Sequence, residues 1–245
     1  MSGLDPGFLA RTFLLALRGI PVTLSLTAAS LAVALPPAAA ICLARIRHVK
    51  GWSTLCALYV SFIRGTPMVV QILVVYSLIP AMLHAISSAL SLNWDVFGTA
   101  PFVYAVTVFG LHAAATLSEV LRSAVLGVDK AQLEAALSLG LPVWRCYAHV
   151  ILPQAAVSAV PNVSNLCVTL VKETSLAFIM TVQEITAIAK IEAARGYNYI
   201  EAYLDMCLVY ILLCSALQGM FLLLEHALHK KFSPHKKFLF LRKKA

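Results

Sequence analysis

Charged and polar side chains interrupt the long apolar stretches of this 245-residue chain at only a few places. An ionisable group at membrane depth is expensive, and it is retained where it faces a protein interior or a water-filled pathway. An arginine there could engage a carboxylate and a glutamate could engage an ammonium group, which would give a polar path for a small charged or zwitterionic solute. The residues of this candidate path are Arg64, Thr66, Gln71, Glu119, Lys172, Glu173, Thr174 and Ser175.

The alternative for each ionisable residue is an internal ion pair that holds a kinked helix bundle together. Taken singly, Arg64, Glu119 and the adjacent Lys172 and Glu173 favour this structural role. Taken as a set, they favour a path, because each group is costly and a bundle can be built without them.

Motifs of enzymatic chemistry are missing from the sequence. None of the 11 glycines opens a GxxxxGK[ST] phosphate loop, and neither a GxSxG nor an HExxH motif occurs. The seven histidines are scattered without the spacing of metal ligands. We therefore expect no catalytic residue and no metal site in this chain.

The elements that must position the polar residues are membrane-crossing helices. The chain is 60% hydrophobic and 12% charged, with a mean hydropathy of +0.85, whereas a soluble domain carries roughly 25% charged residues. This composition excludes a disordered chain, a nucleic-acid-binding module and a secreted disulfide scaffold. A crossing needs about 20 apolar residues. The runs that meet this need without Asp, Glu, Lys or Arg are Gly19–Ala44, Gly65–Trp94, Val96–Ser118, Cys146–Val171 and Met206–Leu224.

We predict an all-α integral membrane protein with five transmembrane helices. The spans are expected at about 19–44, 55–84, 100–122, 155–179 and 203–226. They form a transmembrane domain of residues 19–228, preceded by an external amphipathic segment (1–18) and followed by a basic tail (229–245). The run Arg64-Gly65-Thr66-Pro67 predicts that the second crossing is broken or kinked, and Gln183–Tyr199 is expected to be an external loop.

Lysine and arginine concentrate on one side of this predicted topology. Arg45, Arg47 and Lys50 follow the first span, and the tail after Leu228 is rich in Lys. Basic loops stay in the cytoplasm, so we expect an external N-terminus and a cytoplasmic tail close to anionic membrane lipid.

The loop at 127–153 is expected to fold into a compact cytoplasmic element. Lys130–Leu139 has an apolar face at helical spacing. Gly140 stands where a glycine closes a helix in the left-handed region. Pro142 then begins a second short helix that runs to Pro153. A loop that is folded but too short and polar to cross a bilayer suggests a docking surface for a soluble partner.

The same loop carries a family motif. Glu134-Ala135-Ala136, three residues, Gly140, nine residues and Val150-Ile151-Leu152-Pro153 resemble the EAA motif of permease subunits of ABC importers, with Val150 in place of Ile. Further matches resemble the polar amino-acid branch of that family: Phe62–Pro67 with Gln71, Ser118–Arg122, Leu170–Leu176 and Val182–Glu184. The chain departs from the family pattern at Asp129–Gln132, in the turn before the motif, and at His112–Ala115, where substrate preference could shift.

The resemblance implies a type I importer permease in the bacterial inner membrane. Two permeases, identical or paralogous, would form the pore above two copies of an ATP-binding subunit, and an extracytoplasmic binding protein would deliver a polar amino acid or cystine-like derivative. ATP and Mg would be held by the partner, which hydrolyses ATP, and this chain would bind no cofactor and no nucleic acid. The coupling residues would be Glu134, Ala135, Ala136, Leu139 and Gly140.

Two alternatives remain open at this stage. A stand-alone secondary transporter or channel for a small charged solute would also need polar groups at membrane depth, but it would work without an ATPase. A membrane-embedded enzyme is argued against by the missing catalytic motifs. The sequence leaves open which amino acid is carried, with cystine, basic and acidic substrates all possible.

Overall fold

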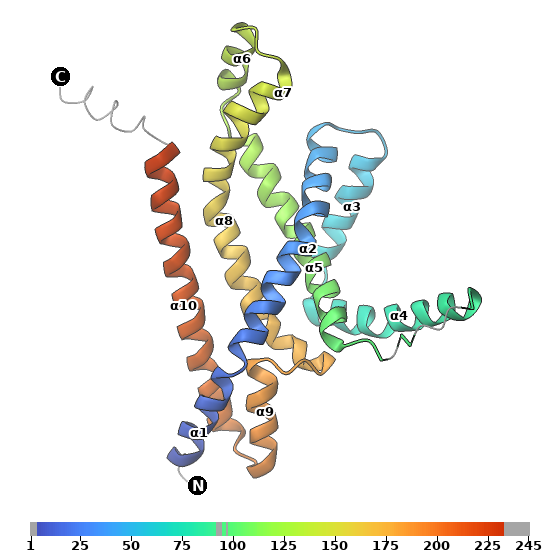
Figure 1. Ribbon diagram of the computed structural model, residues 1–245, viewed down its shortest axis with the longest axis vertical. Helices are drawn as coiled ribbons and strands as arrows, with labels where there is room; N and C mark the ends of the chain where they lie inside the picture. The colour runs from blue at the N-terminus through green and yellow to red at the C-terminus, as the bar shows by residue number, and fades with distance from the viewer. Residues whose placement is uncertain (1–3, 92–94, 97, 233–245) are drawn as a thin grey trace, which may run out of the picture.

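The computed structural model describes residues 4–91, 95–96 and 98–232, and this part of the chain is helical without strands (Figure 1). The all-α membrane fold predicted from the sequence is confirmed. The elements in chain order are α1 (Pro6–Leu17), α2 (Ile20–Ile46), α3 (Trp52–Gly65), α4 (Met68–Ala89), α5 (Pro101–Leu126), α6 (Lys130–Ser138), α7 (Val143–Cys146), a π-helical turn (Tyr147–Ile151), α8 (Leu152–Glu173), a 3-10 helix (Thr174–Met180), α9 (Ile185–Gly196) and α10 (Tyr199–Phe232).

Five helical segments of the described residues are long and apolar enough to cross a membrane. They are Pro6–Ile46, Met68–Ala89, Pro101–Leu126, Val143–Met180 and Tyr199–Leu228. Their number matches the prediction, although several bounds differ. The last helix continues to Phe232, so it enters the predicted basic tail, whose residues 233–245 lie outside the described part.

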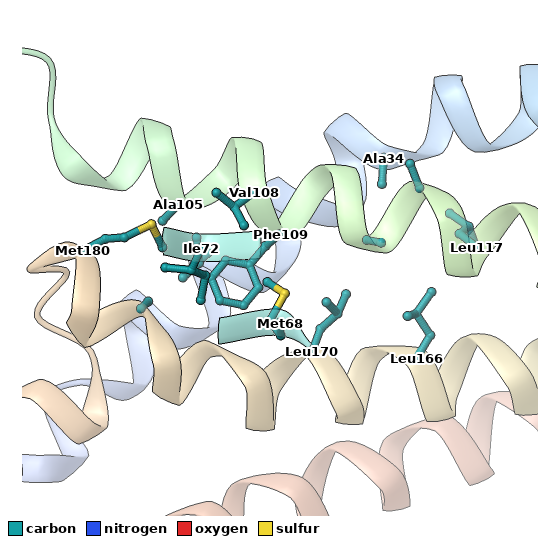
Figure 2. Packing of buried hydrophobic residues seen from close by; sticks show 14 of the residues in the cluster. Ala34, Met68, Ile72, Ala105, Val108, Phe109, Leu117, Leu166, Leu170 and Met180 are labelled. Carbon is teal, nitrogen blue, oxygen red and sulfur yellow. The ribbon is translucent and has the colours of Figure 1, made fainter. Parts of the chain in front are cut away.

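The core lies between α2, α5 and α8, with α4 reaching into it (Figure 2). Phe109 of α5 packs there with Leu26 of α2, Ile72 of α4 and Leu170 of α8, all essentially buried. Small residues such as Ala113 allow the helices to approach closely, which suits membrane bundles because packing replaces the hydrophobic drive of water. This core fixes the faces that α5 and α8 turn toward each other.

The second crossing is broken, as predicted, into two separate helices. α3 ends at Gly65, Thr66 is extended (φ −107°, ψ 138°) and Pro67 precedes α4. Because proline disfavours a helical residue before it, the chain changes direction at this point. Figure 1 shows α4 running out sideways from the bundle, whereas α3 lies beside α2 and α5. The single span expected at 55–84 is therefore divided.

The prediction that the loop helix stops at Pro153 is wrong. α7, the π-helical turn and α8 run on without interruption from Val143. The amide of Leu152 donates to the carbonyl of Tyr147, five residues back, and this step places Pro153 in the first turn of α8. Proline has no N–H and so leaves one bond of this continuous helix unmade, and the wider π-helical turn lies directly before it.

The external loop expected at Gln183–Tyr199 contains the helix α9. Glu184 caps its N-terminus through Oε2 and Oε1, which accept from the amides of Thr186 and Ala187 at 2.8 and 2.9 Å. α9 packs against α1 and α10. The amphipathic segment α1 thus has its buried face covered by protein at this end of the bundle (Figure 1).

Candidate functional site

A buried glutamine ties together the two halves of the broken crossing. The side-chain nitrogen of Gln71 donates to the carbonyl of Ile63 at 2.7 Å, to the carbonyl of Thr66 at 2.9 Å and to the Thr66 hydroxyl at 3.1 Å. That hydroxyl in turn donates to the carbonyl of Phe62 at 2.8 Å. These bonds satisfy backbone carbonyls that the helix break leaves without helical partners. Thr66 and Gln71, predicted as path residues, are therefore in contact.

His112 connects this break to the end of α8. Its Nδ1 lies 3.2 Å from the side-chain oxygen of Gln71, and its Nε2 lies 3.8 Å from Oε2 of Glu173. The side chains of His112 and Glu173 are 15% and 24% exposed. Glu173 is the last residue of α8, and the adjacent Thr174 is buried, with its hydroxyl bonded to the carbonyl of Val171. We call Gln71, His112 and Glu173 the open cluster, because Oε2 of Glu173 is buried and has no hydrogen-bond partner among the residues that the structure describes.

Glu119 belongs to a different group of charges. Its Oε1 pairs with Arg45 of α2, and its Oε2 accepts two bonds from Arg122, one helical turn along α5, at 2.8 and 3.0 Å. We call these three residues the closed cluster, since both carboxylate oxygens have cationic partners. This is the internal ion pairing that the sequence left open as the alternative for Glu119.

Arg64 and Lys172 are not brought into the open cluster. Arg64 is exposed in the last turn of α3. Lys172 is also exposed, whereas the neighbouring Glu173 faces α5. Successive residues of a helix point about 100° apart, so the adjacent Lys and Glu diverge rather than pair. Ser175, in the 3-10 helix, is half-buried.

Sequence reasoning missed the role of His112 as a link. It singled out this residue only as a departure from the family pattern, because a lone histidine on an apolar helix carries no spacing signal. The available signal was its position about two turns before the polar Ser118 and Glu119 on the same helix. The contact with Glu173 depends on how α5 packs on α8, which the sequence does not give.

The first helix of the loop at 127–153 is closed by Gly140, as predicted from the sequence. Gly140 has φ +78°, its amide donates to Leu137, and the amide of Leu141 donates to Ala136. This is a Schellman motif, and only glycine adopts such a φ without steric cost. Asp129 caps the start of α6 by accepting from the amide of Ala131 at 3.0 Å, so the departure from the family pattern at this turn still supplies a helix cap.

The distal end of this loop is apolar and open to solvent. Leu139 is 82% exposed and Trp144 63% exposed, and Leu137 and Val143 lie beside them in sequence with exposed side chains. Of the motif residues, Glu134 and Ala135 are exposed, while Ala136 is buried against the loop. Several large apolar side chains exposed on one short loop are typical of an interaction site. Figure 1 shows α6 and α7 together at the end of the bundle opposite to α1 and α9.

A third carboxylate, Glu184, lies at that opposite end and is fully buried. Besides capping α9, it accepts a hydrogen bond of 2.8 Å from the Tyr210 hydroxyl of α10. Burial raises the pKa of Glu184 to about 7, against the lowering effect of these hydrogen bonds. A β-carbon on Gly19 would lie 2.4 Å from the nitrogen of Ile185, so a glycine is needed where the α1–α2 junction meets the start of α9. Glu184 therefore holds three elements together.

These features define a multi-pass membrane transport protein that works through a partner. The bundle encloses polar groups at membrane depth, and a folded loop presents an apolar surface beyond one end. Residues 37–230 match the family described as binding-protein-dependent transport system inner membrane component. The chain belongs to this family and is a permease subunit of the inner membrane.

Relatives and solved structures agree with this assignment. The chain is 33% identical over 235 residues to the probable amino-acid permease protein YxeN of Bacillus subtilis, covering 95% of this chain and 99% of that protein. It is 32% identical over 211 residues to the L-cystine transport system permease protein TcyL of the same species, covering 86% of each. It is 32% identical over 227 residues to the octopine transport system permease protein OccM of Rhizobium radiobacter, covering 91% of this chain and 90% of that protein.

The fold is shared with a solved amino acid ABC transporter crystallised with histidines. The TM-score is 0.78 at 24% identity, covering 93% of this chain and 100% of that one. The MetNI methionine ABC transporter matches with a TM-score of 0.68 at 18% identity, covering 93% and 99%. These comparisons confirm the resemblance to amino-acid permeases of ABC importers that the EAA loop indicated.

Proposed function

We propose that this permease carries a polar amino acid, or a cystine-like derivative, across the inner membrane in an importer powered by a separate ATPase. The observation that supports this most strongly is the combination of the EAA loop, exposed at one end, with acceptor groups left open inside the bundle. The relatives named for amino-acid, cystine and octopine transport favour this substrate class.

The path is proposed to pass the open cluster. Gln71, Thr66 and Glu173 lie at or next to it, Thr174 follows Glu173, and Ser175 continues into the 3-10 helix. The exposed cations Arg64 and Lys172 could meet the substrate carboxylate from the mouth of the path or across a second permease. Glu119 is assigned to the path only indirectly, because its oxygens are engaged by Arg45 and Arg122.

Partners are assigned to the two ends of the bundle. The apolar surface formed by Leu137, Leu139, Val143 and Trp144, with Glu134 beside it, fits an ATP-binding subunit, and the opposite end with α1 and α9 fits an extracytoplasmic binding protein. We propose two ATP-binding subunits and two permeases, identical or paralogous, per pore. The sideways helix α4, whose Leu73, Val74 and Leu78 are exposed, would then face the second permease or lipid.

In this arrangement the N-terminus is outside and the basic tail lies in the cytoplasm. ATP and Mg are bound and used by the partner, and this chain contributes no cofactor site. Its own part is mechanical, because closure of the ATPase pair would move α6 and α7, and α7 continues through the π-helical turn into α8 and so leads to Glu173. A movement at the loop can thus reach the open cluster through one continuous helical segment.

The test is co-purification of the tagged chain in mild detergent, followed by ATPase measurement. We expect an ATP-binding subunit to co-purify and to be lost or reduced on Glu134→Ala. A chain that purifies alone and moves solute in liposomes without ATP would favour the secondary-transporter alternative.

Gly140→Val is expected to leave membrane insertion intact and to reduce substrate-stimulated ATPase about tenfold. A β-branched residue at φ +78° costs roughly 1–2 kcal/mol and would change the end of α6. The matched control is Gly219→Val in α10, because a β-carbon at either glycine meets no atom within 4 Å. The two variants therefore differ in backbone conformation and not in crowding. Normal stimulation in Gly140→Val would refute the coupling role.

A further inference from the structure

The orientation of the Gln71 amide is fixed by its surroundings. Its nitrogen faces the carbonyls of Ile63 and Thr66 and the hydroxyl of Thr66. The hydroxyl already donates to the carbonyl of Phe62, so it too acts as an acceptor. An amide oxygen cannot donate, so only the NH₂ group, with its two N–H donors, can face these acceptors, and one N–H is shared between two of them. The oxygen of Gln71 must therefore be the atom that points at His112.

This orientation decides where His112 carries its proton. Nδ1 lies 3.2 Å from an oxygen that can only accept, so Nδ1 must be the donor. In a neutral imidazole the other nitrogen, Nε2, then has a lone pair and no proton. Gln71 is thus a positioning residue that selects the tautomer of His112.

The free lone pair of Nε2 faces a carboxylate. Oε2 of Glu173 lies 3.8 Å away, is buried, and has no hydrogen-bond partner in the described part of the chain. Two acceptors that face each other at this distance require a donor group that bonds to both of them, or a proton on one of them. A buried acceptor left without a donor costs about 1–3 kcal/mol, which a bound donor would recover.

The cations nearest in the described part of the chain do not supply this donor. On α8, Lys172 is exposed, although its charge acts on Glu173. On α2 and α5, Arg45 and Arg122 are held by Glu119. On α3, the Tyr59 hydroxyl donates to the carbonyl of Leu111 at 2.6 Å, and Arg64 is exposed. From α4 the group that faces His112 is the neutral Gln71.

We propose that Nε2 of His112 and Oε2 of Glu173 together seat the ammonium group of the transported amino acid, in competition with a proton on His112. An ammonium has three N–H donors and no acceptor, so it suits a seat made only of acceptors, and its charge is balanced by Glu173. A proton on His112 would instead pair the imidazolium with Glu173 and remove both acceptors. This inference rests on the proposed function and specifies which end of the substrate is recognised.

The test is binding of radiolabelled L-arginine, L-glutamine and L-cystine to the purified permease–ATPase complex in nanodiscs, without binding protein, between pH 5 and pH 7.5. For the amino acid that binds, affinity should fall up to tenfold for each unit of pH below the pH at which His112 becomes protonated. Its N-acetylated form should bind at least tenfold more weakly at every pH, because an amide nitrogen carries no charge and a single N–H.

Three variants give the inference its sharpest check. His112→Gln should bind with an affinity that is flat across this pH range, and Glu173→Gln should lose at least tenfold at pH 7.5. Gln71→Glu should shift the pH profile upward, because a carboxylate beside Nδ1 stabilises the imidazolium. A merely structural role would not move the pH profile. Thr169→Val, one turn from Glu173 on an exposed position of α8, is the control and should retain the wild-type profile.

The outcomes separate the two proposals. Binding that is independent of pH in the wild type, an unchanged pH slope in His112→Gln, or equal binding of the N-acetylated form would overturn the ammonium seat while leaving the amino-acid importer intact. Failure of all three amino acids to bind a complex whose ATP-binding subunit is present would instead count against the proposed substrate class. Co-purification of that subunit with each variant shows that the protein is assembled.

Discussion

Two glutamates, Glu119 on α5 and Glu173 at the end of α8, have opposite surroundings in the closed and open clusters. Glu119 has both carboxylate oxygens occupied by arginines from α2 and α5. Glu173 has a buried oxygen that lies opposite a histidine of α5 and has no hydrogen-bond partner within the described part of the chain. His112 and Glu119 are seven residues apart, roughly 10 Å along the helix. In the sequence the two glutamates belonged to one class, namely carboxylates in apolar surroundings.

This difference shows that the role of a buried charge depends more on which residues pair with it than on how deep in the membrane it lies. A charge whose partners are complete adds to the stability of the bundle, and opening it leaves other charges unpaired. A buried charge that lacks a partner destabilises the protein while no ligand is bound. Such a charge is retained where a ligand supplies the missing partner. The first prediction concerns Glu119 and Glu173, the second concerns Glu184, and the third concerns the exposed cations Arg64 and Lys172.

The largest effect is expected from opening the closed cluster. Glu119→Ala leaves Arg45 and Arg122 without a counter-charge, which should lower the free energy of unfolding by about 2–4 kcal/mol. Glu173→Ala removes a buried acceptor that has no partner among the described residues, so it should not lower the free energy of unfolding, while it should reduce uptake at least tenfold. The measurements are thermal unfolding in detergent and uptake in proteoliposomes.

The same two variants test whether Glu119 and Glu173 differ in role. If Glu173→Ala destabilises the protein as much as Glu119→Ala does, the open cluster is structural. If Glu119→Ala folds normally but fails to transport, then Glu119 acts in the path despite its partners.

The next effect concerns Glu184, a glutamate with complete hydrogen bonds but no cation. Its pKa of about 7 in the folded protein lies above the ordinary value of 4.5, so the folded state holds the proton more tightly than the unfolded state does. Its contribution to stability is thus fully present below about pH 4.5 and is lost as the pH rises through 7. We expect the unfolding midpoint to fall between pH 5 and pH 8.

Glu184→Gln should flatten this dependence, because the amide does not titrate. Tyr210→Phe, which removes one hydrogen bond to the carboxylate, should keep the dependence and move it to higher pH. A wild-type midpoint that rises from pH 5 to pH 8 would show that burial does not dominate the titration of Glu184.

The smallest effect is expected from the exposed cations. Arg64→Ala and Lys172→Ala should change stability by less than about 0.5 kcal/mol, because neither side chain has an ion-pair partner among the described residues. Uptake should nevertheless fall roughly three- to tenfold if they meet the substrate carboxylate. Lys50→Ala, an exposed cation in the loop after α2, is the control. Normal uptake in both variants would exclude these two cations from the path.

Much of the fold followed from local rules. Apolar runs located the spans because hydrocarbon demands about 20 apolar residues per crossing. The break at Thr66 and Pro67 and the left-handed Gly140 were predictable from backbone sterics alone. α9 was missed as a helix because its mixture of charged and small residues lacks an apolar period, and its stability comes from packing on α1 and α10.

The site was only partly predictable. Gln71, Thr66 and Glu173 were predicted together as candidate path residues, and their contacts run through His112, which was absent from that group. Glu119, Arg64 and Lys172 entered the same group and were placed elsewhere. The sequence shows that a polar residue in an apolar run is energetically costly. It does not show which residues contact that side chain, because those residues lie on other helices.

By itself, the sequence determined that this chain lies in a membrane, how many times it can cross, where a crossing must break and which loop folds into helices of its own. These properties depend on residues close to one another in the chain, such as the apolar runs, Thr66-Pro67 and the glycine at 140. Only the tertiary structure decided that Glu119 is satisfied and Glu173 is not, because their partners Arg45 and His112 are supplied by the packing of α2, α5 and α8. Charges interact through space, and distance along the chain does not set distance in space.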